Sequence, residues 1–348
     1  MKILITGNMG YVGPGVVTRL RESYPNAELI GYDTGYFAHG LTNVSYLPET
    51  KLNQQIFGDV RNFDPEIFEG VNAVVYLAAI SNDPMGNRFE EVTLDINYKS
   101  AIRMAKTAKD SGVGSFVFAS SCSVYGAADD NAKTETDTLN PLTAYARSKI
   151  AAEEELETLA APDFVVTCLR FATACGYSNR LRLDLVINDF VAGAVTSKKI
   201  DILSDGTPWR PLINVLDMAR AIEWATSRTS DSGGNFLAVN TGSNKWNYQV
   251  RELAEVVAEV VHGCKVLINQ DAPPDKRSYR VNFDLFEKLA PNHQPVFDLK
   301  TSISDLYKNL TEMGFNDINF RESGLVRLNV IKYLQEIKAL NSKLYWNR

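Results

Sequence analysis

The chain has 348 residues, of which 45% are hydrophobic and 22% are charged, which is an ordinary composition for a globular protein. Its formal net charge is -6, so we expect neither a nucleic acid nor an anionic membrane as a partner. The N-terminal residues lack the long apolar core of a signal peptide, and no apolar run reaches the ~20 residues of a membrane span. We therefore expect a cytoplasmic protein with one large domain or two closely packed domains.

Cysteine and histidine show no pattern typical of metal ligands. The three histidines are scattered, and the four cysteines lack metal-ligand spacing; they are Cys122, Cys168, Cys175 and Cys264. We expect these thiols to be buried and reduced, and we expect no metal site.

The chain begins with a predicted buried strand over residues 1–6, which a glycine-rich loop follows. Its glycines stand three residues apart, and residues 16–22 continue as a helix. The first glycine permits a tight turn, the second lets the backbone approach a pyrophosphate, and the third lets helix and strand pack closely. The helix N-terminus then presents free N–H groups to the phosphates. The predicted cofactor-binding loop comprises Gly7, Asn8, Met9, Gly10, Tyr11, Val12 and Gly13.

The second predicted strand, residues 28–32, ends at an acidic residue. Asp33 follows the last glycine of the loop by ~20 residues, which is where an acid binds the adenosine ribose hydroxyls. A carboxylate there repels a 2′-phosphate, so the sequence favours NAD over NADP. The alternative interpretation is that Asp33 merely caps a turn.

Four further predicted strands alternate with helical segments; they are residues 55–57, 73–77, 115–119 and 164–169. A long helix is predicted near residues 88–111. This alternation predicts an α/β fold with a Rossmann-type doubly wound parallel sheet, in which ligands bind at the carboxyl ends of the strands. The candidate site residues directly after these strands are Asp59, Val60, Leu77, Ala78, Ala79, Ser81, Ser121, Cys122 and Ser123.

A tyrosine and a lysine stand four residues apart at the start of a predicted helix. Pro141 precedes a run of good helix formers, so Tyr145 and Lys149 share one face in the first turns. An ammonium near the Tyr145 phenol is expected to lower its pKa from ~10, which suits proton removal from an alcohol. Ser121 is placed to bind the same oxygen. The plainer interpretation is a surface tyrosine and lysine on an amphipathic helix.

The second half has looser periodicity and no clear linker. Predicted elements there are an apolar segment over residues 183–194, helices at 217–227 and 248–261, a strand at 236–240 and a final helix near 324–345. We expect residues 1–170 to form the NAD-binding domain, with about 210–245 packing back on it. Residues 171–348 are expected to be a smaller, mainly substrate-binding α/β part that ends in helices.

Taken together, these motifs resemble the extended short-chain dehydrogenase/reductase family, which comprises nucleotide-sugar epimerases, dehydratases and reductases. The resemblance rests on TGNMGYVG at the start, the acidic residue that ends the second strand, the SSCSVYG segment, the YARSK segment and RPLINVLDMARA at 210–221. It covers roughly residues 1–290.

The resemblance implies a role for each matching residue. Tyr145 is implied as the acid/base, Lys149 as the residue that binds the nicotinamide ribose, Ser121 as the one that orients the substrate, and Asn97 as a helix residue that supports the site. The implied substrate-binding residues are Ser81, Ser121, Cys122, Ser123, Thr173, Arg180, Asn188, Arg210 and Arg277. For Arg180, Arg182 and Arg280, ligand binding and surface solvation fit the sequence equally well. The resemblance also implies a homodimer that pairs the helix of residues 88–111 and the helix carrying Tyr145.

Two positions depart from the family pattern. Sugar 4,6-dehydratases of the family carry an acidic pair directly after the catalytic Ser or Thr, whereas this chain has Cys122 and Ser123, so dehydration is not expected. Thr173 stands where many members have an asparagine that contacts the nucleotide sugar.

The sequence predicts an NAD-dependent nucleotide-sugar epimerase acting at C4, with a nucleoside-diphosphate sugar as substrate. The alternatives are a sugar dehydrogenase or 4-ketoreductase with net redox turnover, and a non-catalytic NAD-binding protein.

Overall fold

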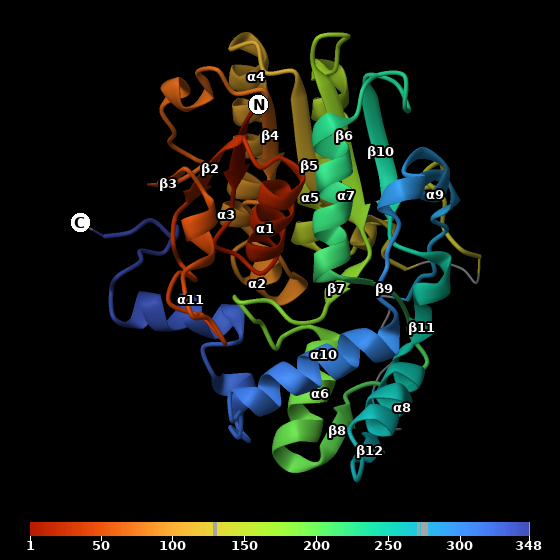
Figure 1. The fold of residues 1–348 in the computed structure, drawn as a ribbon. Helices are drawn as coiled ribbons and strands as arrows, with labels where there is room; N and C mark the ends of the chain where they lie inside the picture. Colours follow the sequence, from red (N-terminus) through yellow and green to blue (C-terminus); the bar gives the residue numbers. More distant parts are fainter. Residues whose placement is uncertain (128–130, 270–271, 273–277, 348) are drawn as a thin grey trace.

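A seven-stranded parallel sheet forms the centre of the molecule, with the strand order β10-β6-β5-β4-β1-β2-β3 (Figure 1). The computed structural model describes residues 1–127, 131–269, 272 and 278–347. The strands of this sheet are β1 (Lys2–Thr6), β2 (Glu28–Asp33), β3 (Gln54–Phe57), β4 (Ala73–Tyr76), β5 (Ser115–Ser121), β6 (Val165–Phe171) and β10 (Phe236–Thr241). The predicted Rossmann-type doubly wound fold is confirmed.

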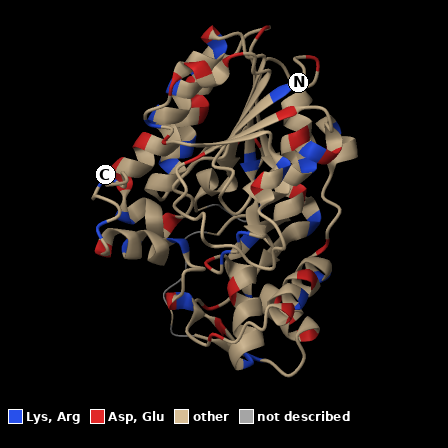
Figure 2. Ribbon diagram, turned by 60° about the vertical axis from the view of Figure 1, so that its left-hand side comes forward, with Lys and Arg blue, Asp and Glu red and all other residues tan. Residues whose placement is uncertain are grey.

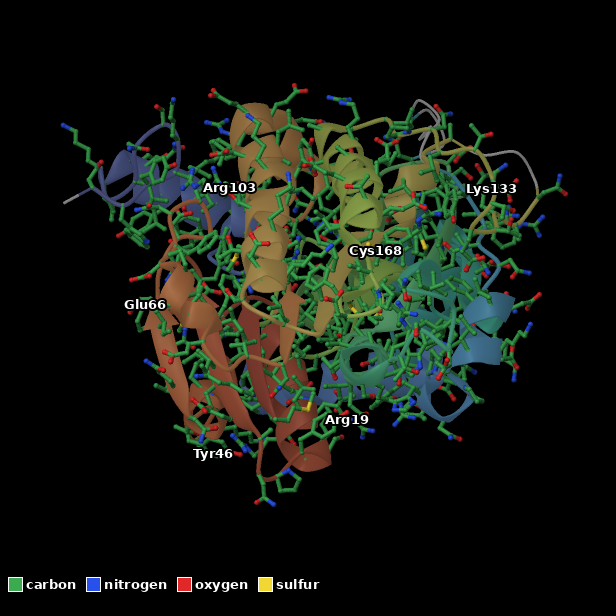
Figure 3. All side chains as sticks on the ribbon, turned by 90° about the horizontal axis from the view of Figure 1, so that it is seen from above. Arg19, Tyr46, Glu66, Arg103, Lys133 and Cys168 are labelled. Carbon is green, nitrogen blue, oxygen red and sulfur yellow. The ribbon has the colours of Figure 1, made fainter. Side chains whose placement is uncertain are left out.

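Helices cover both faces of the sheet because alternate strand residues are apolar on both sides. In β1, Ile3 and Ile5 join the apolar cluster beneath α1 (Gly13–Ser23) and α7 (Val215–Ser227). Leu4 joins the cluster on the opposite face, beneath α4 (Ala101–Asp110) and α5 (Ala144–Leu159). Figure 3 shows these layers from above, with side chains filling the space between sheet and helices and Cys168 inside the molecule.

The long helix predicted at 88–111 is interrupted. The chain forms α2 (Asp83–Arg88), α3 (Glu90–Leu94), a π-helical stretch η3 (Asp95–Ser100) and then α4. π-helical turns inside helices are frequently found at functional sites. This one contains Asn97, whose side-chain amide donates to the Ile80 carbonyl over 3.0 Å and accepts from the Ile80 N–H over 2.8 Å.

The second half builds a smaller lobe below the carboxyl ends of the strands and also returns to the large sheet (Figure 1). β10 pairs with β6, and α7 packs on α1. The lobe has its own apolar cluster. Its elements are β7 (Thr173–Cys175), α6 (Val186–Ser197), β8 (Lys199–Ile202), β9 (Trp209–Asn214), β11 (Asn247–Gln249), α8 (Val250–Val260), β12 (Lys265–Ile268) and α10 (Leu299–Glu312).

The remaining described elements are α9 (Asp284–Leu289) and the short helices η1 (Pro48–Lys51), η2 (Pro65–Phe68), η4 (Cys122–Tyr125), η5 (Asn244–Trp246), η6 (Pro291–His293) and η7 (Phe320–Glu322).

The last helix is much shorter than its predicted span of 324–345. α11 runs only over Arg327–Glu336, and Lys338 (φ 59°) and Leu344 (φ 58°) adopt left-handed backbone conformations that no helix contains. A bridge between Leu340 and Trp346 closes a small turn instead. Residues 340–347 therefore return toward the sheet, with Leu340 and Leu344 buried.

Positive and negative side chains are intermixed over the ribbon, in keeping with the modest net charge (Figure 2). Among the described residues, no helix is long and apolar enough to cross a membrane. Within the same residues, no group of three or more histidine, cysteine or acidic side chains is arranged to hold a metal ion. All four cysteines are free thiols.

Candidate active site

A cavity of about 900 Å³ opens at the carboxyl ends of the central strands, between the sheet and the smaller lobe. Its walls come from the glycine loop after β1, the ends of β2, β4 and β5, the start of α5 and the first residues of the smaller lobe. The predicted site residues in its wall are Gly7, Gly10, Tyr11, Val12, Asp33, Asp59, Val60, Leu77, Ala78, Ala79, Ser81, Ser121, Ser123, Tyr145, Lys149, Thr173 and Arg210.

The glycine loop makes a cradle that side chains would fill. Gly7 has φ +74°, and a Cβ there would lie 2.6 Å from the Ala78 nitrogen; at Gly13 it would lie 1.8 Å from the Asn8 oxygen. Asp33 holds this loop, since its Oδ2 accepts from the Met9 N–H at 2.9 Å and its Oδ1 from the Gly35 N–H at 2.7 Å. A backbone cradle beside a carboxylate fits the pyrophosphate and ribose of a dinucleotide.

Burial raises the pKa of Asp33, while the hydrogen bonds from Gly35 and Met9 and the positive charge of Arg180 oppose that rise. The alternative interpretation, that Asp33 caps a turn, accounts for one of its two contacts, because Asp33 Oδ1 accepts a hydrogen bond from the Gly35 N–H. Its other oxygen binds the cofactor loop, so capping does not account for the whole arrangement.

Four predicted cofactor residues lie behind the cavity wall and do not line it. They are Asn8, Met9, Gly13 and Asn97. Asn8 donates to Gln55 Oε1 over 2.6 Å, and Asn97 donates to Ser148 Oγ over 3.1 Å. These residues shape the loop and the helix that face the cavity.

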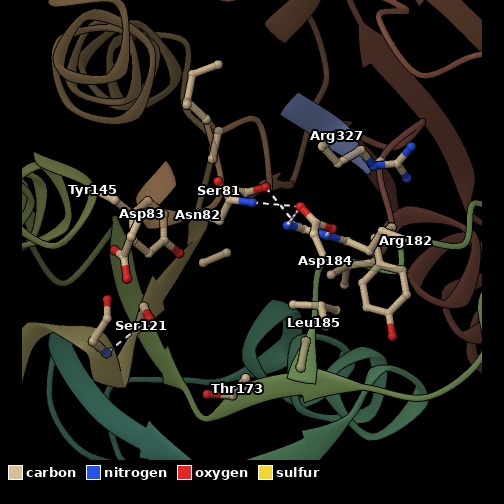
Figure 4. Close-up of a pocket in the computed structure, with 18 of the residues that line it drawn as sticks. Ser81, Asn82, Asp83, Ser121, Tyr145, Thr173, Arg182, Asp184, Leu185 and Arg327 are labelled. Carbon is tan, nitrogen blue, oxygen red and sulfur yellow. Dashed lines mark hydrogen bonds and ion pairs between the residues drawn. The ribbon is translucent and has the colours of Figure 1, made fainter. Parts of the chain in front are cut away.

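The predicted catalytic residues meet at the junction of β5 and α5. Thr143 caps the N-terminus of α5, since its Oγ1 accepts from the Ala146 N–H at 3.2 Å. That cap places Tyr145 in the first turn, where it is partly exposed and lines the cavity together with Ser121 (Figure 4). One turn later, Lys149 is only 2% exposed, and its Nζ donates to the Ala119 carbonyl over 2.7 Å.

The expected lowering of the Tyr145 pKa is wrong for this structure. Burial raises it to about 12, and the hydrogen bond from Ser121 only partly opposes that rise. Burial also lowers the pKa of Lys149 to about 7. The physical reason is geometric: the Lys149 ammonium points to a backbone carbonyl and lies 5.6 Å from the centroid of the Tyr145 ring. Desolvation therefore outweighs the attraction between the two groups.

A buried ion pair supports this corner from behind. Glu153 lies one turn beyond Lys149 on α5 and accepts two hydrogen bonds from Arg170, the shorter over 2.7 Å. Ser120 donates to the same carboxylate. Because Glu153 follows Lys149 by four residues on a predicted helix, the sequence could have indicated that the two side chains share one helix face. Nothing in the sequence indicated the partner of Glu153 on β6.

A polar cluster closes the cavity on the side of the smaller lobe. Arg182 donates to both oxygens of Asp184, over 2.7 and 2.9 Å, and to Ser81 Oγ over 3.0 Å. Asn82 donates to Asp184 Oδ2 over 2.7 Å. Figure 4 shows this cluster across the cavity from Tyr145 and Ser121. Surface solvation is thus excluded for Arg182, which is 5% exposed.

Three predicted substrate-binding residues do not reach the cavity wall. Cys122 is fully buried, and its thiol donates to the Arg170 carbonyl over 3.0 Å. Arg180 is also fully buried, and its guanidinium donates to Ala38 O over 2.5 Å and to Glu49 over 2.8 Å. Asn188 accepts from the Gly176 N–H at 3.0 Å. These side chains hold loops in place, because they bind backbone groups and, in the case of Arg180, also the Glu49 carboxylate.

The other two predicted substrate-binding serines face the cavity differently. Ser121 Oγ accepts from the Ser123 N–H at 3.1 Å. Ser123 Oγ is buried and lacks a hydrogen-bond partner among the described residues, although the residue lines the cavity.

Arg210 also lines the cavity and donates to the Trp209 carbonyl over 2.8 Å. The prediction for Arg277 falls outside the described residues.

Two cavity features were missed by the sequence analysis. Asp83 accepts from Thr143 Oγ1 over 2.7 Å and faces Tyr145, and its charge raises the pKa of that phenol. Gly86 lets α2 lie against the same side chain, since a Cβ there would be 3.1 Å from Tyr145 Cβ. The contact between Asp83 and α5 has no local signal in the sequence, because the two lie 60 positions apart.

A glycine cradle, an acid at the end of β2 and a Ser-Tyr-Lys set at the ends of parallel strands are the arrangement of an NAD-binding enzyme of the extended short-chain dehydrogenase/reductase type. The model of the NAD dependent epimerase/dehydratase family matches residues 3–242. The chain belongs to that family, and NAD is the cofactor of the family.

Relatives and solved structures agree with this assignment. A protein of Methanocaldococcus jannaschii named putative UDP-glucose 4-epimerase is 26% identical over 314 residues, which cover 86% of this chain and 95% of the relative. A UDP-glucose 4-epimerase of Corynebacterium glutamicum is 27% identical over 279 residues, covering 75% and 80%. The structure of MoeE5 in complex with UDP-glucose and NAD is 25% identical, with a TM-score of 0.75, and covers 90% of this chain and 99% of MoeE5.

Proposed function

We propose that the protein is an NAD-dependent nucleotide-sugar epimerase that inverts C4 through a transient 4-keto sugar, with Tyr145 as the acid/base. The observation that carries the proposal is that Tyr145 and Ser121 line the same cavity as the glycine cradle and Asp33. Relatives of comparable length that carry the name UDP-glucose 4-epimerase support the choice of reaction.

The chain's own residues then divide the work. Ser121 holds the C4 oxygen, and Tyr145 removes the hydroxyl proton and later returns it. The glycine cradle and Asp33 would hold NAD, which would supply a reversible hydride acceptor for C4 of the sugar. Because burial raises the Tyr145 pKa to about 12 in this structure, the phenol is protonated at neutral pH and is a weak acid until its phenolate is stabilised. Its ionisation depends on a protonated Lys149 moving closer, since an ammonium stabilises a phenolate.

Dehydration is disfavoured at the position that distinguishes the dehydratases. Cys122 stands where they carry an acid, and burial raises the pKa of its thiol far above the ordinary range. The thiol is also turned away from the cavity, toward the Arg170 carbonyl. It therefore has neither the charge nor the position to remove a proton from a sugar carbon.

The cluster of Arg182, Asp184, Asn82 and Ser81 faces Tyr145 across the cavity and is proposed to hold the sugar and diphosphate together with Arg210. Guanidinium groups suit anionic oxygens because of their fixed fork of donors. The homodimer remains a prediction, and light scattering of the purified protein tests it.

The test is to incubate the purified protein with glucose or galactose linked to UDP, dTDP, GDP or CDP and to follow both sugars by NMR. For one of the four nucleotides, an epimerase would give the same equilibrium mixture of the glucose and galactose forms, whichever of the two is supplied. Reduced cofactor would not accumulate. Accumulation of reduced cofactor with each turnover would instead show a dehydrogenase, and loss of water would show a dehydratase. Either result would overturn the proposal.

A further inference from the structure

The C-terminal residues lie against the segments that carry Asp33 and Asp59. We call residues 340–347 the tail. Figure 1 shows the dark blue C-terminal trace returning from α11 toward β2 and β3. The tail lies outside residues 3–242, which the family model matches.

The first contacts join the tail to the loop after β2. Trp346 Nε1 donates to the Thr34 carbonyl over 2.7 Å and lies 3.1 Å from Thr34 Oγ1. The Tyr36 hydroxyl donates to the Leu344 carbonyl, and the Tyr36 and Trp346 ring centroids are 5.7 Å apart. Thr34 and Tyr36 both line the main cavity directly after Asp33. The tail therefore supports the wall beside the residue that is predicted to bind the adenosine ribose.

The second set of contacts runs through Arg61. Its Nη2 pairs with Asp59 over 2.6 Å, while Nη1 donates to the Lys343 carbonyl over 2.6 Å. The same guanidinium stacks on Tyr345, 3.6 Å from the ring centroid, which is within the range of a cation–π contact. One buried cation thus ties the Asp59 carboxylate to the tail.

A second cavity lies between the tail and the ends of β2 and β3. It has a volume of about 500 Å³ and is lined by Thr34, Gly35, Phe57, Gly58, Asp59, Tyr345 and Trp346. Thr34, Gly58 and Asp59 also line the main cavity, so the two spaces adjoin at these residues. Aromatic rings beside a carboxylate acceptor suit a flat purine that carries an exocyclic amine.

We propose that the tail is the outer wall of the adenosine end of the NAD site and that it slows the release of NAD. Leu340 and Leu344 are buried and anchor the tail, whereas Trp346 is 44% exposed. The end of the tail around Trp346 is therefore the part whose local opening costs the least free energy. The proposal rests on NAD as the cofactor and is independent of which sugar reacts.

The test compares wild type with Trp346→Ala, Tyr345→Ala and a chain ending at Ala339, all stripped of NAD. Calorimetric titration with AMP and with NAD gives the affinities, and chase with excess unlabelled NAD gives the release rate. We expect each point variant to weaken AMP and NAD by the same factor, about tenfold, or about 1.4 kcal/mol, mostly through faster release. Equal losses locate the effect at the adenosine half, because AMP lacks the nicotinamide half.

Tyr333→Ala is the matched control, since Tyr333 is an exposed aromatic on α11; it should bind both ligands as wild type does. Unchanged AMP and NAD affinities in Trp346→Ala and Tyr345→Ala would overturn the proposal. These point variants decide the matter even where the shortened chain fails to fold. A wild-type chain that bound neither ligand would overturn the cofactor assignment as well, and so would be distinguished from a failure of the tail alone.

Hydrogen exchange supplies a second readout. Binding is reciprocal, so a tail that strengthens AMP binding must itself be protected by AMP. We expect slower exchange of the amides at Leu344–Asn347 in the presence of AMP and unchanged exchange in α10. Equal exchange of the tail amides with and without AMP would contradict the proposal.

Discussion

The two ends of the large cavity are built in different ways. At the catalytic end, Ser121 and Tyr145 come from β5 and α5, which follow one another in the chain and are joined by a buried lysine. At the adenosine end, Thr34 meets a tryptophan 312 positions later. The predicted catalytic groups are positioned by β5 and α5, which are near one another in the chain. The proposed adenosine end forms only when the loop after β2, the segment of Asp59 and Arg61, and the tail pack together. Chemistry and cofactor retention should therefore be separable by mutation.

The largest effect is expected at the catalytic end, from Tyr145→Phe. Loss of the phenolic hydroxyl removes the acid/base, and we expect turnover to fall about 10³-fold, within the range for general acid–base catalysis. NAD affinity should stay unchanged, because the cradle and Asp33 are untouched. Steady-state kinetics by NMR and titration with NAD measure the two quantities. Tyr98→Phe is the control, since that hydroxyl bonds only Glu155 on the outer face among the described contacts; equal turnover in both variants would contradict the assignment.

Next in size is the loss of Arg61, which links Asp59 to the tail. We expect Arg61→Gln to reduce the free energy of unfolding by about 2–3 kcal/mol, because Asp59 loses its buried partner; the reduction is moderated by the 21% exposure of the Asp59 side chain. NAD should also be released faster. Chemical denaturation and the NAD chase measure these effects. Arg147→Gln breaks an exposed pair with Glu90 and should cost less than about 1 kcal/mol; equal costs would show that the Arg61 contacts are unimportant.

Asp33→Asn tests the proposed adenosine end through the relative affinities for NAD and NADP. The neutral amide loses a charged acceptor for the ribose and for the Met9 N–H, so we expect NAD to bind roughly thirtyfold more weakly, or about 2 kcal/mol. NADP should lose less, because the repulsion of its 2′-phosphate is removed. Titration with each dinucleotide gives the ratio. The exposed Asp110→Asn serves as control, and an unaltered NAD to NADP ratio in Asp33→Asn would refute the role of the carboxylate.

A separate effect concerns the pH dependence of stability, and it tests the buried lysine at the catalytic end. The Lys149 pKa is about 7 in the folded protein and 10.5 unfolded. Between these values the unfolded chain binds the extra proton, so the free energy of unfolding gains up to about 1.4 kcal/mol per pH unit as pH rises. Below pH ~7 both states are protonated, and this contribution is constant.

The measurement is the pH dependence of unfolding of protein freed of NAD, from pH ~7 to ~10. Lys149→Met should lack the rise that wild type shows, while Lys106→Met, at an exposed ion pair, should keep it. Parallel curves for wild type and Lys149→Met would mean that the lysine titrates normally.

The sequence by itself determined the fold class and the cofactor, and it predicted that Ser121, Tyr145 and Lys149 would lie together. These signals are local: a glycine loop between a strand and a helix, an acid at a strand end, and two residues spaced by one helical turn.

Only the tertiary structure decided which polar groups reach the cavity. Arg180 and Asn188 were expected to bind substrate, yet each satisfies buried backbone groups, because docking two loops leaves carbonyls and N–H groups that need partners. The pKa values of Tyr145 and Lys149 followed burial more than their spacing. The tail looked like the end of a helix, and its contact with Thr34 has no local signal in the sequence. Contacts between distant segments depend on how the whole chain packs, and a local pattern does not contain that information.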